Sequence, residues 1–167
     1  MMMRSKLLTM VFASMLFGLV STAQAQTPAP DPAATGTWVL DTRASKTTNP
    51  MGMPKSGERT YAIADNAEKM NATVVLADGK EIKEDFVGMV PDGKDRPFHS
   101  TALGDGVTLA AKSSAPKHVD FVLKKGGKDI ITGTRTISAD GKVMTIATKG
   151  MTADGKPFEA SMVWNKK

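Results

Sequence analysis

The C-terminal stretch, residues 127–167, contains the same turn twice, Ala139-Asp140-Gly141-Lys142 and Ala153-Asp154-Gly155-Lys156, between three alternating segments. Asp-Gly at such a position favours a type I′ hairpin, because both central residues of that turn need φ > 0. Asp-Gly-Lys recurs at residues 78–80 and 92–94. We interpret the recurrence as favourable turn chemistry; a duplicated hairpin module is the alternative, but the segments around the turns do not match well.

Short alternating segments fill the rest of the chain and predict about ten strands. They are residues 35–41, 58–64, 70–77, 81–90, 96–101, 107–112, 118–125, 129–138, 143–149 and 158–165. This spacing is typical of all-β sandwiches and barrels, and helical periodicity is absent beyond the N-terminal segment.

The links between these segments favour a closed sheet. Most are a few residues long, so successive strands pair in sequence order. A flat meander would expose two long edges, which closure removes. We therefore predict a single up-and-down antiparallel β-barrel of about 8–10 strands, a form that can hold a small ligand. A Greek-key sandwich is the alternative, and only residues 43–57 and 113–117 offer room for its long connections.

The N-terminal segment has the three parts of a secretory signal. Arg4 and Lys6 precede the apolar run Leu7–Val20, and Ala23-Gln24-Ala25 has the small-x-small cleavage pattern. A membrane anchor would need about 20 apolar residues. We predict that residues 1–25 are a signal peptide cleaved near Ala25, which implies a periplasmic or secreted protein without a stable membrane anchor.

The remaining chain divides into a short linker and one domain. Residues 26–34 contain three prolines and no large apolar side chain, so we expect a disordered linker. Residues 35–167 form the predicted barrel domain. The formal net charge of the whole chain is +5 and the charges are interspersed, so nucleic acid is not an expected partner. The chain has no cysteine, which excludes a disulfide and a lipid attached through a cysteine.

Several motifs resemble the lipocalins and related calycins. Gly36-Thr37-Trp38 resembles the lipocalin Gly-x-Trp, and Arg135 resembles the basic residue that packs over that tryptophan. Residues 36–167 also resemble small exported bacterial lipocalin-like proteins with a C-terminal Ser-x-Asp-Gly-Lys, Lys-Gly, Asp-Gly-Lys-Pro series. That series stands here at Ser138–Lys142, Lys149-Gly150 and Asp154–Pro157.

The resemblance has two departures from secreted lipocalins: the disulfide and the long C-terminal helix are absent from this sequence. The ten-stranded fatty-acid-binding proteins fit the strand count and the C-terminal strand better. Their two-helix lid would have to fit into residues 43–57, which contain two prolines.

The alternation predicts a set of side chains that face the interior: Trp38, Leu40, Tyr61, Ile63, Val74, Leu76, Ile82, Phe86, Val90, Leu109, Phe121, Leu123, Ile131, Met144, Ile146, Phe158, Met162 and Trp164. From this set we predict the ligand-binding residues Arg135, Tyr61, Phe86, Phe121, Met144 and Met162. Methionine in such a wall adapts to varied apolar ligands. Arg135 lies on an apolar face and must be paired or solvated. It either holds a ligand carboxylate or closes the barrel by stacking over Trp38, and Glu84 is its candidate ionic partner.

No catalytic or metal motif emerges. The chain lacks Gly-x-Ser-x-Gly, His-Glu-x-x-His and cysteine nucleophiles, so we predict that it is not an enzyme and has no cofactor. His99 and His118, with Met51 and Met53 as soft ligands, are the only metal candidates, and nothing in the sequence brings them together. We predict no metal site.

The sequence therefore predicts a periplasmic or secreted protein that binds a small hydrophobic or amphipathic ligand, such as a fatty acid, in a barrel cavity. The alternative is a structural or protein-interaction barrel of the cell envelope with a filled core, whose loop at residues 43–57 meets a partner. An enzyme that uses the cavity is a third hypothesis, which rests on fold analogy. The sequence identifies no protein partner.

Overall fold

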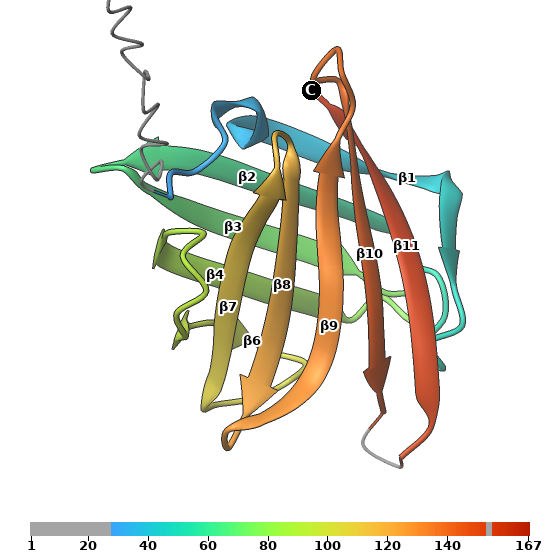
Figure 1. Cartoon of the computed structure of the whole chain (residues 1–167). Coiled ribbons are helices and arrows are strands. Elements are labelled where there is room, and N and C mark those ends of the chain that lie inside the picture. Colours follow the sequence, from blue (N-terminus) through green and yellow to red (C-terminus); the bar gives the residue numbers. More distant parts are fainter. Residues whose placement is uncertain (1–27, 153–154) are drawn as a thin grey trace, which may run out of the picture.

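The computed structural model describes residues 28–152 and 155–167, and within them the chain is almost entirely antiparallel β-sheet. The predicted signal peptide and Asp154 lie outside the described residues. The sheet has the strand order β5-β7-β8-β9-β10-β11-β1-β2-β3-β4-β6 (Figure 1). The strands and the 3-10 helix are η1 (Pro32–Ala34), β1 (Gly36–Thr47), β2 (Ser56–Ala64), β3 (Ala67–Val75), β4 (Glu81–Met89), β5 (Arg96–Pro97), β6 (His99–Ser100), β7 (Val107–Ala115), β8 (His118–Lys125), β9 (Lys128–Ile137), β10 (Val143–Met151) and β11 (Pro157–Lys166).

The first strand pairs with the last. Trp38 lies opposite Lys166 and Leu40 opposite Trp164, while residues 36–39 of β1 also pair with β2. A bulge between Asp41 and Lys46 bends β1, and the Asp41 carboxylate accepts hydrogen bonds from the N–H groups of the two residues that follow Thr42. Because of this bend, β1 can pair with β2 through residues 36–39 and with β11 through residues 38–41 and 46–47. The up-and-down antiparallel barrel predicted from the sequence is confirmed, with 11 strands in one sheet where about 8–10 were predicted.

The remaining seam lies between β4 and β7, and a strap of residues 91–100 covers it. Within the strap, β6 pairs with β4 and β5 pairs with β7, and Phe98 is buried between the two short strands. Gly93 N–H donates to Ala111 C=O at 2.7 Å, and Asp92 forms a bridge with Lys112. The barrel is therefore nearly closed, with a thin seam in place of continuous pairing.

The Asp-Gly-Lys turns at residues 78–80 and 140–142 are in the predicted places, but the turn at residues 140–142 is not of the predicted type. Gly141 has φ +72°, whereas Asp140 is not among the residues with positive φ. A type I′ turn at this position is therefore wrong. The Asp140 carboxylate instead accepts the N–H of Lys142, two residues on, and Asp78 accepts that of Lys80 in the same way. Asp and Gly thus act separately: the carboxylate fixes the turn and the glycine takes the left-handed conformation.

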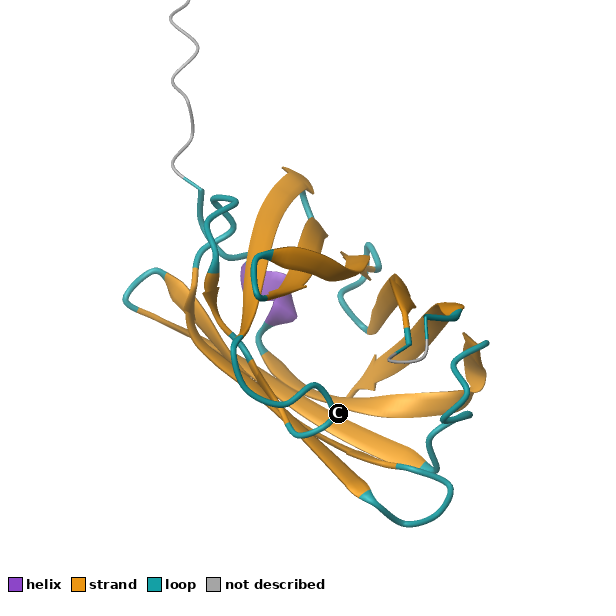
Figure 2. Cartoon of the chain, turned by 90° about the horizontal axis from the view of Figure 1, so that it is seen from below, coloured by secondary structure: helices purple, strands orange, loops and turns teal. Residues whose placement is uncertain are grey.

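The end of the predicted disordered linker is folded. Asp31 caps η1 by accepting from Ala33 N–H, and its other oxygen accepts from Lys117 N–H. Ala34 is fully buried, and its carbonyl accepts a hydrogen bond from the indole Nε1 of Trp38 at 2.8 Å. Disorder is therefore the wrong expectation for residues 31–34, because tertiary hydrogen bonds offset their low apolar content. The short helix lies within the curve of the strands when the barrel is seen from below (Figure 2).

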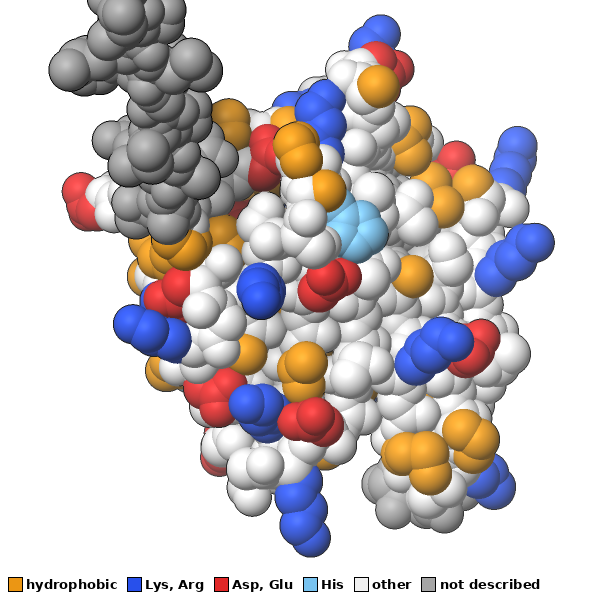
Figure 3. Space-filling view, in the orientation of Figure 1, with side chains coloured by type: hydrophobic (Ala, Val, Ile, Leu, Met, Phe, Trp, Pro, Cys, Tyr) orange, Lys and Arg blue, Asp and Glu red, His pale blue; other side chains and the backbone are white. Residues whose placement is uncertain are grey.

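The surface charges are mixed. Lysine, arginine, aspartate and glutamate side chains alternate over the face seen in Figure 3, and no continuous region of one sign is visible on it. Among the described residues, no helix is long and apolar enough to span a membrane.

Candidate functional site

A cavity of about 820 Å³ lies inside the barrel. Side chains from β1–β4 and β7–β11 point into it, because alternate residues of each strand face the interior. Its wall is mostly apolar, and the apolar side chains that line it include Leu40, Met70, Val74, Leu76, Ile82, Phe86, Leu109, Phe121, Leu123, Ile131, Ile146, Phe158, Met162 and Trp164. The volume falls in the range of small-molecule pockets, about 300–1,000 Å³. A filled core, the sequence-based alternative, is therefore wrong.

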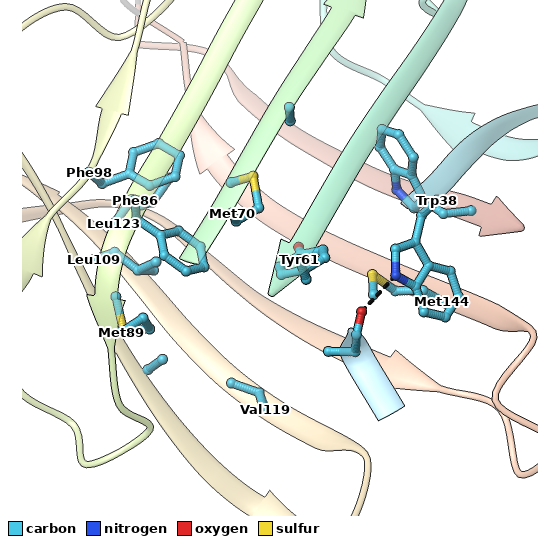
Figure 4. Close-up of a cluster of buried hydrophobic side chains, with 14 of the residues drawn as sticks. Trp38, Tyr61, Met70, Phe86, Met89, Phe98, Leu109, Val119, Leu123 and Met144 are labelled. Atoms are coloured by element: carbon cyan, nitrogen blue, oxygen red, sulfur yellow. Dashed lines mark hydrogen bonds between the residues drawn. The ribbon is translucent and has the colours of Figure 1, made fainter. Parts of the chain in front are cut away.

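The two ends of the cavity differ. At one end, Trp38 and Met144 are fully buried side by side, and η1 covers them (Figure 4). At the other end, the wall includes the exposed Met51 of the β1–β2 loop and the exposed Met151 at the end of β10. The cavity therefore reaches the protein surface at the end that carries these two methionines.

Five polar side chains of the wall are linked to one another by direct contacts, and they define the interior cluster: Arg59, Tyr61, Glu68, Glu84 and Arg135. Their positions follow from the strand registers. On β2, Arg59 and Tyr61 are two residues apart and face the same side, while Glu68 on β3 and Glu84 on β4 share the inner face with Met70 and Phe86.

Arg135 and Glu68 form a two-point ion pair. Arg135 Nη1 and Nη2 lie 2.5 and 3.0 Å from the two carboxylate oxygens of Glu68, and the side chains are 9% and 5% exposed. Burial alone would lower the pKa of Arg135, but the Glu68 carboxylate overcomes this effect and raises that pKa above its ordinary value. The guanidinium is charged and both of its terminal nitrogens are engaged.

The structure corrects two sequence-based expectations about Arg135. Its guanidinium lies over the ring of Tyr61, 4.9 Å from the ring centre, and not over Trp38. The cation over Trp38 is the Lys166 ammonium, at 5.1 Å, because β11 runs directly beside β1. The ionic partner of Arg135 is Glu68 and not Glu84. Arg135 still lines the cavity, and a role in ligand binding stays a prediction.

Arg59 and Glu84 form a looser pair. One contact of 3.4 Å joins Arg59 Nη2 to a Glu84 oxygen, and the side chains are 11% and 25% exposed. Burial raises the pKa of the Glu84 carboxyl, and Arg59 offsets only part of this effect. Arg59 Nη1 donates a hydrogen bond to the Tyr61 hydroxyl at 3.1 Å. Tyr61 therefore lies between the two arginines, one at its hydroxyl and the other over its ring.

Three buried polar atoms of the described residues have no hydrogen-bond partner: Arg59 Nε, Ser100 Oγ and Trp164 Nε1. All three belong to side chains that line the cavity, and all three can donate. Buried donors without an acceptor are rare in folded proteins because each costs free energy. The Arg59 guanidinium lies 4.4 Å from the ring centre of Trp164, so two of these donors are on adjacent side chains.

The other predicted ligand-binding residues divide into two groups. Tyr61, Phe86, Phe121 and Met162 line the cavity, and their contact with a ligand stays a prediction. Met144 does not line it. Its side chain is fully buried beside Trp38, opposite Trp164 and Ile137 in the sheet, so it belongs to the packed end of the barrel.

Sequence reasoning missed Arg59 and Glu68. Arg59 is two residues before Tyr61, a predicted inward residue, and Glu68 is two residues before Met70, which shares a strand face with the predicted inward residue Val74. Extending the alternation back by one step would have placed each on the inner face. The predicted strand at residues 70–77 began too late to include Glu68, which pairs with Met89 near the start of β3.

The histidines lie apart from the interior cluster. His99 pairs with Asp85 at 2.9 Å and His118 with Asp120 at 3.1 Å, all at least partly exposed to solvent. In the part of the chain that the structure describes, no group of three or more histidine or carboxylate side chains is arranged to hold a metal ion.

No protein-family model matches the chain, and no curated protein sequence is significantly similar to it. Among solved structures, the chain is similar to the crystal structure of zebrafish ileal bile acid-binding protein complexed with cholic acid. The TM-score is 0.46 at 10% sequence identity, over 81% of this chain and 99% of that one.

Proposed function

We propose that this protein is a periplasmic or secreted binding protein that holds one small hydrophobic or amphipathic molecule in its barrel, without catalysing a reaction on it. The observation that carries the proposal is the cavity of about 820 Å³ inside the barrel, which reaches the protein surface beside Met51 and Met151 and has a largely apolar wall. An apolar molecule that enters it removes its own surface and that of the wall from water, at about 25 cal/mol per Å².

The interior cluster favours an amphipathic ligand over a pure hydrocarbon. Charged groups inside an apolar wall cost free energy unless they are paired, and three donors of the wall have no partner. A ligand with one polar end would supply acceptors for these donors while its apolar part covers the aliphatic wall. A fatty-acid-like molecule has this form.

Native mass spectrometry of the protein purified from its own export pathway tests the proposal. We expect a bound species with a mass offset of one lipid-sized molecule, which is released on denaturation and identified by extraction. The same preparation reports the mass of the mature chain and hence the cleavage site near Ala25. A protein that is always empty, and that takes up no fatty acid on incubation, would contradict the proposal.

A further inference from the structure

The two ion pairs of the interior cluster differ in how firmly they are held. Glu68 and Arg135 meet through two short contacts, whereas Arg59 and Glu84 share one contact of 3.4 Å. Both pairs balance their own charge, so the interior cluster carries two positive and two negative groups. The looser pair is the one that an incoming ligand can rearrange at the smaller cost.

Arg59 has donor capacity that the protein does not use. Its Nη1 is bound to Tyr61, its Nη2 makes only the long contact with Glu84, and its buried Nε has no partner. The neighbouring Trp164 is 2% exposed and presents a second buried donor without a partner. An arginine fork with free donors in an apolar cavity suits an oxyanion, because Arg binds carboxylates through two parallel hydrogen bonds.

We propose that Arg59 binds the carboxylate head group of the ligand, and that Glu84 gives up its contact with Arg59 and takes up a proton as this happens. The inference rests on the proposed function. It deepens that function by naming a carboxylic acid as the ligand class and β2, beside Trp164, as the place of its head group.

The proton uptake follows from charge balance. A carboxylate added to a neutral cluster leaves one uncompensated negative charge in an apolar cavity, which is costly. The charged residues that line this cavity are Arg59, Glu68, Glu84 and Arg135 of the interior cluster, together with Asp31, Lys125 and Asp129. The last three are partly or fully exposed to solvent, and Tyr61 is the remaining titratable group of the interior cluster. Glu68 is held at both oxygens, so Glu84 is the carboxylate that can become neutral. Its raised pKa supports this assignment.

Fluorescence titration with cis-parinaric acid and with its methyl ester tests the site. We expect the wild-type protein to prefer the acid by roughly 10- to 100-fold, the effect of one or two charge-assisted hydrogen bonds. In R59M/E84M the preference should be lost while the ester still binds. R59K, which keeps the charge without the planar fork, should show an intermediate preference.

Two further variants separate this site from the rest of the protein. E68M/R135M removes the competing interior site, and if Arg59 holds the head group this variant should retain a larger preference for the acid than R59M/E84M does. K149Q/E159Q removes an exposed pair whose ammonium and carboxylate lie 2.9 Å apart on β10 and β11, and it should match wild type. A preference that is lost in E68M/R135M and kept in R59M/E84M would move the head group to Arg135 and overturn the inference.

The pH dependence tests the role of Glu84 without removing Arg59. Between pH 6.5 and 8.5 the affinity of wild type for the acid should fall by up to about tenfold per pH unit, because binding takes up a proton. E84Q should bind the acid more tightly and without this slope. A flat wild-type profile, or equal slopes in the two proteins, would overturn the proton uptake.

The outcomes also separate this inference from the proposed function. Equal binding of acid and ester by wild type would leave a barrel that binds apolar molecules and would refute the Arg59 site. Binding of neither probe by the folded protein would refute the proposed function itself.

Discussion

Removing one member of the Glu68–Arg135 pair should destabilise the barrel strongly, whereas removing both should not. In E68M the Arg135 guanidinium remains buried, 9% exposed, without its carboxylate partner. Breaking a buried pair in this way costs about 3–5 kcal/mol, because the remaining charge is not compensated. For a domain of this size that corresponds to a fall in Tm of roughly 10–20 °C.

In the double variant E68M/R135M two apolar side chains of similar volume replace the pair. Such replacements are often neutral or stabilising by about 1–4 kcal/mol. The double-mutant cycle should therefore show a large coupling energy, with the double variant far more stable than the sum of the two single losses predicts. Urea unfolding followed by far-UV circular dichroism measures all four proteins.

The exposed pair Lys149–Glu159 is the control for the cycle. Its side chains are 73% and 67% exposed, and E159M should change the free energy of unfolding by about 1 kcal/mol or less. If E68M behaved like this surface variant, the Glu68–Arg135 pair would not be a buried, mutually dependent unit. The description of the interior cluster would then be wrong.

Three further predictions concern stability. In G133A, the added Cβ would lie 2.5 Å from the Phe121 ring, and we expect a loss of about 1–3 kcal/mol in urea together with weaker binding of a cavity probe. In W38F, the buried Ala34 carbonyl loses its donor, which should cost about 1–3 kcal/mol and speed hydrogen exchange around η1. The pKa of Glu84 is raised above its ordinary value of 4.5, so the folded state binds this proton more tightly than the unfolded chain does. Wild-type stability should therefore fall as the pH rises from that value to the folded-state pKa, and E84Q should lack this part of the pH profile in urea titrations at each pH.

The barrel itself was predictable from local patterns. Alternation along segments such as residues 118–125, short links, and Asp-Gly turns together imply a meander, and a meander of this length must close or expose its edges. These are properties of the backbone and of the period of two, which a single sequence carries directly. The pairing of Trp38 with a C-terminal strand followed from them.

Irregular backbone limited the prediction of the interior. The sequence placed Val90 inside, but Met89 faces the core instead. A register shift between the Glu68–Met89 and Met70–Phe86 pairs, with Gly88 at φ +76°, moves the later residue to the other face. A bulge of this kind moves every side chain beyond it to the opposite face of the sheet, and the alternating sequence pattern does not predict the bulge.

The partners of the interior charges were not predictable. Arg135 was recognised as a charge on an apolar face, but its partner lies 67 residues away on β3. Which carboxylate it meets depends on the curvature of the barrel, which brings β9 opposite β3 across the cavity. The folding of residues 31–34 was missed for a similar reason, because the hydrogen bonds that fix the segment to the barrel come from Trp38 and Lys117, which lie outside it.

The most direct test of the account is where a bound molecule lies. Isotope-filtered NMR on methyl-labelled protein with unlabelled palmitic acid would report nuclear Overhauser effects between the acid and individual methyl groups. The account predicts contacts with Met162 and Ile146 of the cavity wall and none with Val87, which is 74% exposed on the outer face of β4. Contacts confined to Val87 and other exposed methyl groups, in a protein that remains folded, would contradict it.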